Sequence, residues 1–190
     1  MGTINIEIDS RDLEILKASL EKYPKEALRA LPNALNRGAI RARKLMAQEA
    51  RKHYNITSAE VKNTIDIEKA SPSKLEAKAI SEDKMLKLSN FKFSYDNAST
   101  VRTPVTVAVK RGGKKLISSQ PPVFYGKGDL FHRASATDRR VRLAMTLSIP
   151  QMISNEEVFQ QIQREGNEYV HERLIHELEY RHALVFGSLF

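Results

Sequence analysis

The chain has 190 residues, 41% of them hydrophobic and 28% charged, a balance typical of a folded domain and unlike that of a disordered chain. It contains no cysteine, which excludes disulfides, thiolate nucleophiles and cysteine-bound metals. No apolar run reaches the length of a transmembrane helix, and the first residues lack the pattern of a signal peptide. We therefore expect a single domain over residues 1–190 that has no membrane contact and is made and kept in the cytoplasm.

The net charge of +8 is unevenly distributed along the chain. Residues 25–54 hold eight basic and two acidic side chains, and residues 101–142 hold ten and two. Residues 155–190 have the opposite charge balance, with three basic and seven acidic side chains. A basic surface attracts phosphate backbones, whereas patches of opposite sign also allow copies of one chain to dock head to tail. Composition alone leaves both interpretations open.

The first predicted elements are a strand and a helix. Residues 3–8 alternate apolar and polar side chains, which predicts a half-buried strand. The dipeptide Asp9-Ser10 offers an N-cap for a helix over residues 11–22. Three leucines share one face of that helix: Leu13, Leu16 and Leu20.

The longest helical pattern covers residues 25–54. Pro24 suits the first position of this helix, where its missing N–H costs nothing. One apolar stripe is predicted to face the core, and it consists of Leu28, Leu31, Leu35, Ala39, Ala42 and Met46. Pro32 predicts a kink or a fresh helix start within the pattern.

A hairpin and several shorter strands follow this helix. Thr57 and Glu60 predict a capping box at the start of a short helix that ends near residue 63. Residues 64–70 and 75–80 alternate and predict a β-hairpin around a turn at 71–73. Further strands are predicted over 105–109, 130–134 and 141–149. Three intervening segments are predicted to be irregular: residues 81–103, a basic loop at 110–115 and a loop-rich stretch at 116–128. The first of them contains an aromatic cluster of Phe91, Phe93 and Tyr95.

A second long helix is predicted over residues 155–183. Pro150 ends the preceding strand, and Ser154 with Glu157 predicts a second capping box. The apolar tail at 185–190 either packs locally or contacts a partner. The predicted fold class is α+β, a mostly antiparallel sheet flanked by one long helix in the N-terminal half and one long C-terminal helix.

No pattern of catalytic or metal-binding residues emerges from the sequence. His171 and His176 resemble a zinc-binding pair, but they are five residues apart instead of four, so on a helix the rings point about 140° apart. The chain has no nucleophile-elbow pattern and no phosphate-cradling glycine loop that ends in Lys-Ser or Lys-Thr. We predict no enzymatic activity, no catalytic or metal-binding residues and no cofactor.

Two basic patches are the candidate contact sites, for a protein partner or for DNA. The residues are Arg37, Arg41, Arg43, Lys44, Lys110, Arg111, Lys114 and Lys115. The alternatives are a solvated or subunit-facing surface and a non-specific nucleic-acid-binding domain that uses the patches at 37–52 and 110–115. No recognised nucleic-acid-binding motif accompanies them, so any such contact would be made to the backbone.

Several stretches, taken in order, resemble the phage minor tail protein Z family. They are Ala34-Leu-Asn-Arg-Gly-Ala-Ile-Arg-Ala-Arg43, Tyr54-Asn-Ile-Thr57, Val61-Lys-Asn-Thr-Ile-Asp-Ile-Glu-Lys-Ala70, Phe131-His-Arg-Ala134, Ser148-Ile-Pro-Gln-Met152 and Arg173-Leu-Ile-His-Glu-Leu-Glu-Tyr-Arg181. The resemblance covers roughly residues 25–182 and rests on order and spacing, because no single stretch is diagnostic.

This resemblance implies a structural role in tail completion, at the head-proximal end of the tail where head and tail join. The implied partners are the tail tube, the tail terminator and the head connector, with copies of the chain forming a ring around a DNA channel. The implied location is the virion tail, and the host cytoplasm during assembly. The resemblance supplies no catalytic residues.

Overall fold

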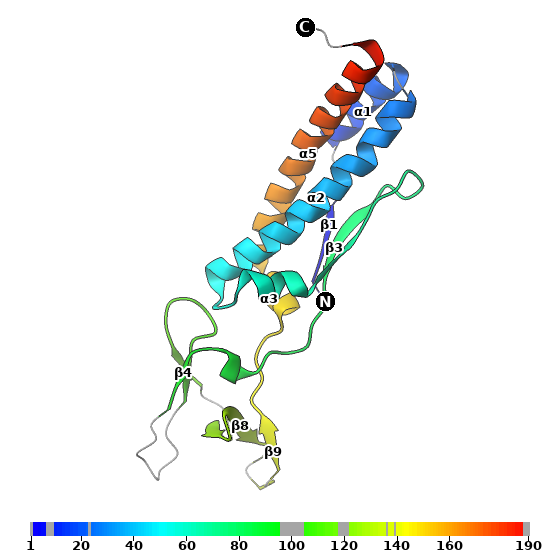
Figure 1. Cartoon of the computed structure of the whole chain (residues 1–190). Helices are drawn as coiled ribbons and strands as arrows, with labels where there is room; N and C mark the ends of the chain where they lie inside the picture. Colours follow the sequence, from blue (N-terminus) through cyan, green and yellow to red (C-terminus); the bar gives the residue numbers. More distant parts are fainter. Residues whose placement is uncertain are drawn as a thin grey trace.

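Two parts of different construction make up the chain, a body of helices with one sheet and a β-rich arm that extends from one end of it (Figure 1). The body comprises residues 2–83 and 148–187, and the arm comprises residues 84–147. The computed structural model describes residues 2–6, 10–22, 24–95, 105–117, 122–135, 137–138 and 140–187. The predicted α+β class, with antiparallel sheets and a long helix in each half, is confirmed.

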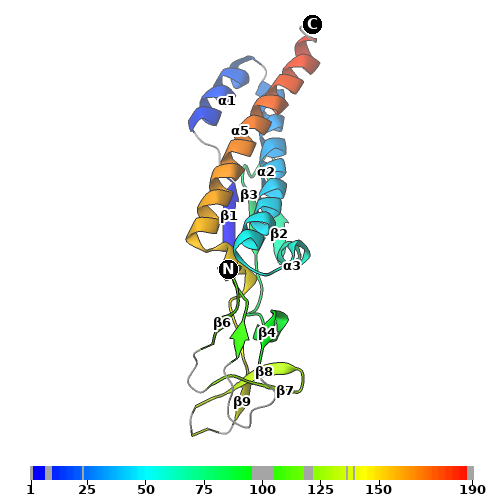
Figure 2. The same cartoon turned by 90° about the vertical axis from the view of Figure 1, so that its left-hand side faces the viewer.

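Two long antiparallel helices, α2 (Pro24–His53) and α5 (Glu156–Phe186), lie side by side along the body (Figures 1 and 2). The shorter helix α1 (Ser10–Lys22) packs on both of them, at the end far from the arm. Small side chains at Ala34 and Ala42 are fully buried on α2, which lets the helices approach closely. On α5 the buried positions include Ile162, Leu174 and Leu178.

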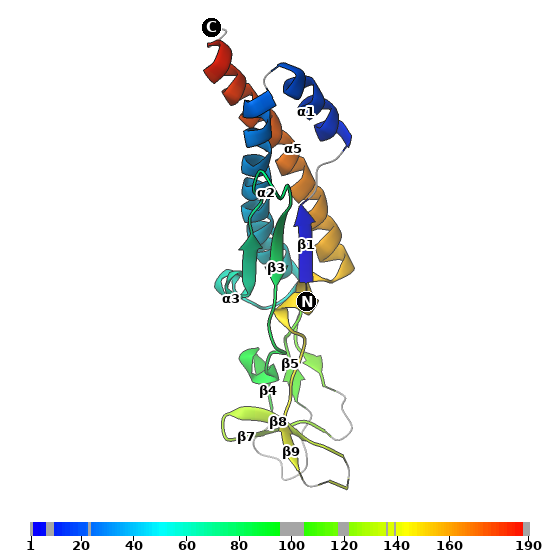
Figure 3. The ribbon, with the colours of Figure 1, turned by 90° about the vertical axis from the view of Figure 1, so that its right-hand side faces the viewer.

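A three-stranded antiparallel sheet forms the second layer of the body (Figure 3). Strand β3 (Ala77–Ser81) is central, between β1 (Gly2–Ile6) and β2 (Ile65–Glu68). Ala79 stands opposite Ile4 on one side and Ile67 on the other. Alternate residues of β3 are buried, so its small side chains pack on the helices while the other face is solvated.

Most sequence-based predictions for the body are confirmed, including the first strand, the first helix, Pro24 at the start of α2, and the hairpin formed by β2 and β3. The Thr57–Glu60 capping box is present and opens α3 (Ser58–Asn63). Residues 7–9 lie outside the described residues, as do the side chains of Leu13 and Leu20. Of the three leucines predicted to share a face of α1, Leu16 is buried.

Two predictions for α2 are wrong in part. Leu28 is exposed although the rest of its stripe is buried. The β2–β3 hairpin meets α2 where Asn36 exchanges two hydrogen bonds with the backbone of Ala70, about 12 Å along the helix from Leu28, so the sheet does not cover that end. A fresh helix start at Pro32 is also wrong, because α2 is continuous through it. Burial of its neighbours Leu31 and Leu35 offsets the one lost hydrogen bond.

The arm is built from two small antiparallel sheets and one short 3₁₀ helix, η1 (Leu88–Asn90). One sheet contains β4 (Phe93–Ser94), β5 (Thr106–Val107) and β6 (Lys115–Leu116) in that order. The other contains β7 (Phe124–Gly126), β8 (Asp129–Arg133) and β9 (Val141–Leu143). Lys127 and Gly128 connect β7 to β8, and both have positive φ, as a tight two-residue hairpin turn requires.

Arm and body share one continuous set of buried apolar side chains. Val105, Val107, Leu130 and Ala144 of the arm belong to the same buried cluster as the α2 and α5 residues. At the junction the backbone N–H of Asn55 donates to the carbonyl of Val109 at 2.9 Å, and that of Arg111 donates to the carbonyl of His53 at 2.8 Å. The arm and the body are therefore joined by both apolar packing and backbone hydrogen bonds.

The arm and the segment that follows it depart from several sequence-based predictions. Strands β4 and β7 lie in segments predicted to be irregular, and the predicted strand over 141–149 is only three residues long. A short helix, α4 (Ile149–Ile153), was not predicted. The capping box predicted at Ser154 is wrong, because Ser148 and Gln151 form one at the start of α4 and Asn155 precedes α5 without a side-chain cap.

Candidate interaction surfaces

A basic groove of about 580 Å³ runs along the exposed side of α2. Its lining residues are Arg37, Ile40, Arg41, Arg43 and Lys44 of α2, Lys62 of α3 and Tyr169 of α5. Residues 37, 41 and 44 recur at helical spacing, so their side chains share one face over about two turns. The groove therefore brings together all four α2 residues predicted as contacts, and it adds Ile40 of the same helix and two residues from elsewhere in the fold.

Two arginines of the groove are held by contacts to neighbouring elements. Arg41 lies over the ring of Tyr169, with 5.6 Å from its guanidinium carbon to the ring centroid. Arg43 donates a hydrogen bond of 2.7 Å to the backbone carbonyl of Lys62. The Nε atoms of both arginines are buried and have no hydrogen-bond partner among the described residues. The guanidiniums are thus positioned by contacts to α3 and α5.

Carboxylates of α5 neutralise only part of this charge. Arg37 pairs with Glu177 at 3.3 Å, and Arg41 lies 3.9 Å from Glu165. Within the described part of the chain, no ion pair joins Arg43, Lys44 or Lys62 to a carboxylate. The groove consequently carries a surplus of about three positive charges, bordered on the α5 side by negative ones.

The second predicted patch, residues 110–115, lies apart from the groove and is partly structural. Arg111 donates from its backbone to the carbonyl of His53 at 2.8 Å and from Nε to the carbonyl of Arg51 at 2.5 Å. These are end carbonyls of α2, so Arg111 caps the helix with a cation where the dipole is negative. Lys110 lies over the ring of Tyr54 at 5.9 Å. Lys114 and Lys115 are exposed.

A second hollow of about 600 Å³ lies beside Arg111. It is lined by Gln48, Glu49, Arg51, Lys52, Arg111 and Glu165. Here the charges nearly balance, with three cations and two carboxylates in the lining. Lys52 pairs with buried Glu49 at 2.6 Å, and this hydrogen bond raises the pKa of Lys52 above its usual value. The balance of charge makes this hollow a weaker candidate for an anionic ligand than the groove.

The arm exposes an unusual number of large apolar side chains for its size. Leu116 is 58% exposed and Val141 53%, and both lie on edge strands of their sheets. Among the described residues of the arm, the large apolar side chains that are exposed are Met85, Leu116, Phe124, Tyr125, Val141, Leu143, Met145 and Leu147. Exposed apolar side chains gathered on short edge strands are typical of a surface that binds another protein.

Aromatic stacking joins the two sheets of the arm. Tyr95 stacks on Tyr125 with ring centroids 4.3 Å apart, and Phe93 lies 5.6 Å from the same ring. Because Phe93 belongs to β4 and Tyr125 to β7, this contact ties one sheet to the other. Of the predicted aromatic cluster, Phe93 and Tyr95 take part in this stack, while Phe91 is buried in the core.

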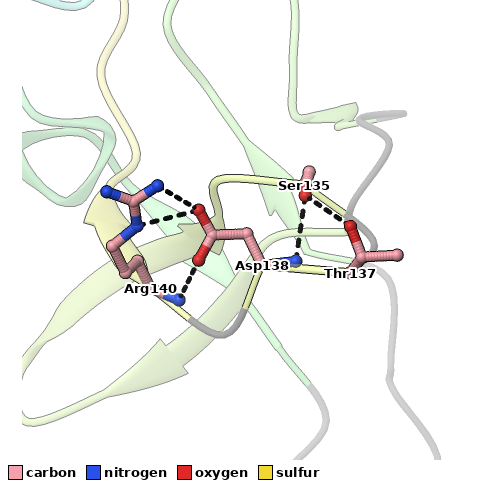
Figure 4. Close-up of polar contacts among 4 residues, drawn as sticks. All are labelled: Ser135, Thr137, Asp138 and Arg140. Carbon is pink, nitrogen blue, oxygen red and sulfur yellow. Dashed lines mark hydrogen bonds and ion pairs between the residues drawn. The ribbon is translucent and has the colours of Figure 1, made fainter.

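The turn between β8 and β9 is fixed by side-chain hydrogen bonds (Figure 4). Asp138 accepts from the backbone of Arg140 at 2.9 Å and from its Nε and Nη2 at 2.8 and 2.7 Å. The backbone of Asp138 in turn donates to the hydroxyl of Ser135 at 2.9 Å. The bonds from Arg140, side chain first, lower the pKa of Asp138 below its ordinary value of 3.8.

The described residues contain no group of three or more His, Asp or Glu side chains placed to hold a metal ion. His171, one of the two histidines noted in the sequence, points at buried Asp12 of α1, with 2.6 Å between Nδ1 and Oδ1. His176 is exposed. Of the helices that the structure describes, none combines the length and apolarity needed to cross a bilayer.

Comparison of the chain with family models, with curated proteins and with solved structures found no match.

Proposed function

We propose that this chain is a structural protein of a phage or prophage tail, which acts in tail completion and head–tail joining by docking onto other tail components. The resemblance of residues 25–182 to the minor tail protein Z family motivates the assignment. The observation that carries the docking role is the arm, whose edge strands expose Leu116, Val141 and Leu143 to solvent.

The energetics of the arm favour a docked state. Its strands are two to five residues long, and so few paired residues stabilise a sheet only weakly. Burying the exposed half of one leucine or valine contributes about 1 kcal/mol. A partner that covers several of these side chains would therefore stabilise the arm and gain affinity at the same time. The proposed partners are the tail tube, the tail terminator and the head connector.

A binding assay with arm variants tests this proposal. The chain is mixed with the tail-tube, terminator and connector proteins encoded near it, and complexes are detected by size-exclusion chromatography with light scattering. We expect V141D/L143D to lose binding at least tenfold while remaining folded. Leu28→Asp, which places the same charge on an exposed leucine of the body, is the matched control and should bind normally. Equal binding by all three proteins, or no binding by the wild type, contradicts the proposal.

A non-specific nucleic-acid-binding role is the second candidate, and the basic groove favours it. Arg43, Lys44 and Lys62 have surplus charge that phosphates would neutralise. In a duplex titration against salt, this role requires affinity that falls steeply with ionic strength and is weakened in K44E/K62E.

A further inference from the structure

We propose that the basic groove receives the acidic outer face of α5 from a second copy of the chain. The inference rests on the proposed function, whose partner and contact surface it specifies. It assigns an occupant to the groove. The cations that line the groove are Arg37, Arg41, Arg43, Lys44 and Lys62.

The complementary surface lies on the solvent side of α5. Glu168, Glu172 and Glu179 are exposed there, and their spacing of four and seven residues keeps them within about 40° on one helix face. The ion pairs of the described residues join neither Glu172 nor Glu179 to a cation of the same chain. The helix therefore presents a negative stripe that matches the groove in sign.

The acidic stripe is also long enough to cover the groove. The cations on α2 extend from residue 37 to residue 44, which is about 10 Å along the helix axis. The acidic stripe extends from residue 168 to residue 179, about 16 Å. One acidic helix thus covers the groove from end to end, with exposed Ile40 beneath the apolar stems of the glutamates.

Within the described residues of one chain, no ion pair joins the groove cations Lys44 and Lys62 to Glu172 or Glu179, so both surfaces are open to a second copy. A contact between different patches on identical chains is heterologous, and it leaves one free groove and one free stripe on every pair. Further copies then add in the same way, and the chain of contacts ends only by closing into a ring.

A nucleic-acid duplex fits the groove less well than an acidic helix. A duplex presents one negative charge per about 1.7 Å along its axis, whereas the groove is short and bordered by carboxylates. Glu165 lies 3.9 Å from Arg41, and Glu177 pairs with Arg37. These groups would repel a continuous phosphate backbone that passes beyond the groove. An acidic helix that carries three carboxylates over about 16 Å brings fewer negative charges near Glu165 and Glu177, so this repulsion is smaller.

Light scattering at two ionic strengths, with charge-reversed variants, tests the contact. At 50 mM salt and high protein concentration, we expect the wild type to exceed the monomer mass of 21.6 kDa and to return to it at 500 mM salt. K44E/K62E and E172K/E179K should each remain monomeric. An equimolar mixture of the two variants should regain assembly, because the reversed groove of one matches the reversed stripe of the other. K114E/K115E, which changes exposed lysines outside the groove, should assemble like the wild type.

Three results overturn the inference: a wild type that stays monomeric at 50 mM salt, variants that assemble as well as the wild type, and a mixture that fails to assemble although the wild type does. Loss of duplex binding in K44E/K62E with no change in self-association would assign the groove to nucleic acid instead. If the wild type binds tail components through the arm yet never self-associates, this inference fails and the proposed function stands. Circular dichroism of each variant confirms that it is folded.

Discussion

Replacing Glu177 by glutamine tests how far a buried ion cluster holds α2 against α5. The Glu177 carboxylate accepts hydrogen bonds from Arg173 at 3.1 Å and from Asn33 at 3.4 Å, and it forms an ion pair with Arg37 at 3.3 Å. Glutamine keeps the size of the side chain but removes the charge. With its carbonyl oxygen toward the two guanidiniums, it turns its NH₂ group toward the Asn33 amide, which donates to the carboxylate in the wild type. The variant therefore leaves the two guanidiniums without a charged partner and places two NH₂ groups against each other.

The expected cost follows from the exposure of the partners. Removing one member of a fully buried pair costs about 3–5 kcal/mol, while an exposed pair contributes about 0–1 kcal/mol. The side chain of Glu177 is 8% exposed, that of Arg173 20% and that of Arg37 56%. We therefore expect Glu177→Gln to lower the free energy of unfolding by about 2–3 kcal/mol, Arg173→Met by about 1–2 and Arg37→Met by less than about 1.

Urea denaturation followed by circular dichroism measures these differences. In a chain of this size, a loss of 2–3 kcal/mol lowers the melting temperature by about 5–10 °C. The control is Glu179→Gln, which removes a carboxylate from the exposed face of the same helix. It should change the free energy of unfolding by less than about 0.5 kcal/mol. An Arg37→Met cost equal to that of Glu177→Gln would refute the reasoning, because it would mean that solvent does not screen the outer pair.

Three further predictions concern single contacts. His171→Ala should lower the free energy of unfolding by about 1–3 kcal/mol and speed hydrogen exchange in α1, since it removes the link from α5 to a buried carboxylate of α1. The control is His176→Ala, on the exposed face of α5, which should leave that exchange unchanged. Ser148→Ala should lower the free energy of unfolding, measured by urea denaturation, by about 1 kcal/mol, because it removes the side-chain cap of α4. Ser154→Ala should leave this free energy nearly unchanged, because the Ser154 side chain caps no helix. The pKa of Asp138 is lowered in the folded arm, so its contribution to stability is complete well above pH 3.8 and is lost as the pH falls through the folded value; a carbon-13 carboxyl titration that gives an ordinary or raised pKa would contradict this.

The sequence allows the body to be predicted because its elements are long and regular. The apolar stripe of α2 repeats over five turns, and the cap at Thr57 uses residues three positions apart. Neither feature depends on distant parts of the chain. Leu28 belongs to the same stripe, yet it is exposed because its burial depends on how far the sheet reaches along α2.

The arm could be predicted much less well. Strands β4 and β7 are two and three residues long, too short for an alternating pattern, and the stacking of Tyr95 on Tyr125 depends on tertiary structure. For α4 the signals were present, since Ser148, Pro150 and Gln151 form a cap with proline in the first turn. The alternation of the preceding strand candidate obscured them.

Only some of the residues that line the groove could be placed there from the sequence. Arg37, Arg41 and Lys44 share a face by helical spacing alone, so their proximity follows from the sequence. Lys62 and Tyr169 come from other helices, and no local pattern places them beside α2. Arg111 has a structural role at the end of α2 because the loop after β5 meets residues 51–55, a contact between segments that are about 60 residues apart in the sequence.

The arm is inserted between the two segments that close the body, and this order affects how the chain folds during synthesis. Helix α2 ends at residue 53 and its packing partner α5 begins only at residue 156. At a translation rate of about 5–20 residues per second, the apolar face of α2 waits roughly 5–20 s for that partner to emerge from the ribosome. During this interval the sheet can cover part of the face, but the side destined for α5 stays open to chaperones and to other nascent chains. Stability of the finished protein and yield of soluble protein can therefore vary independently, and substitutions on this face of α2 will affect the yield most.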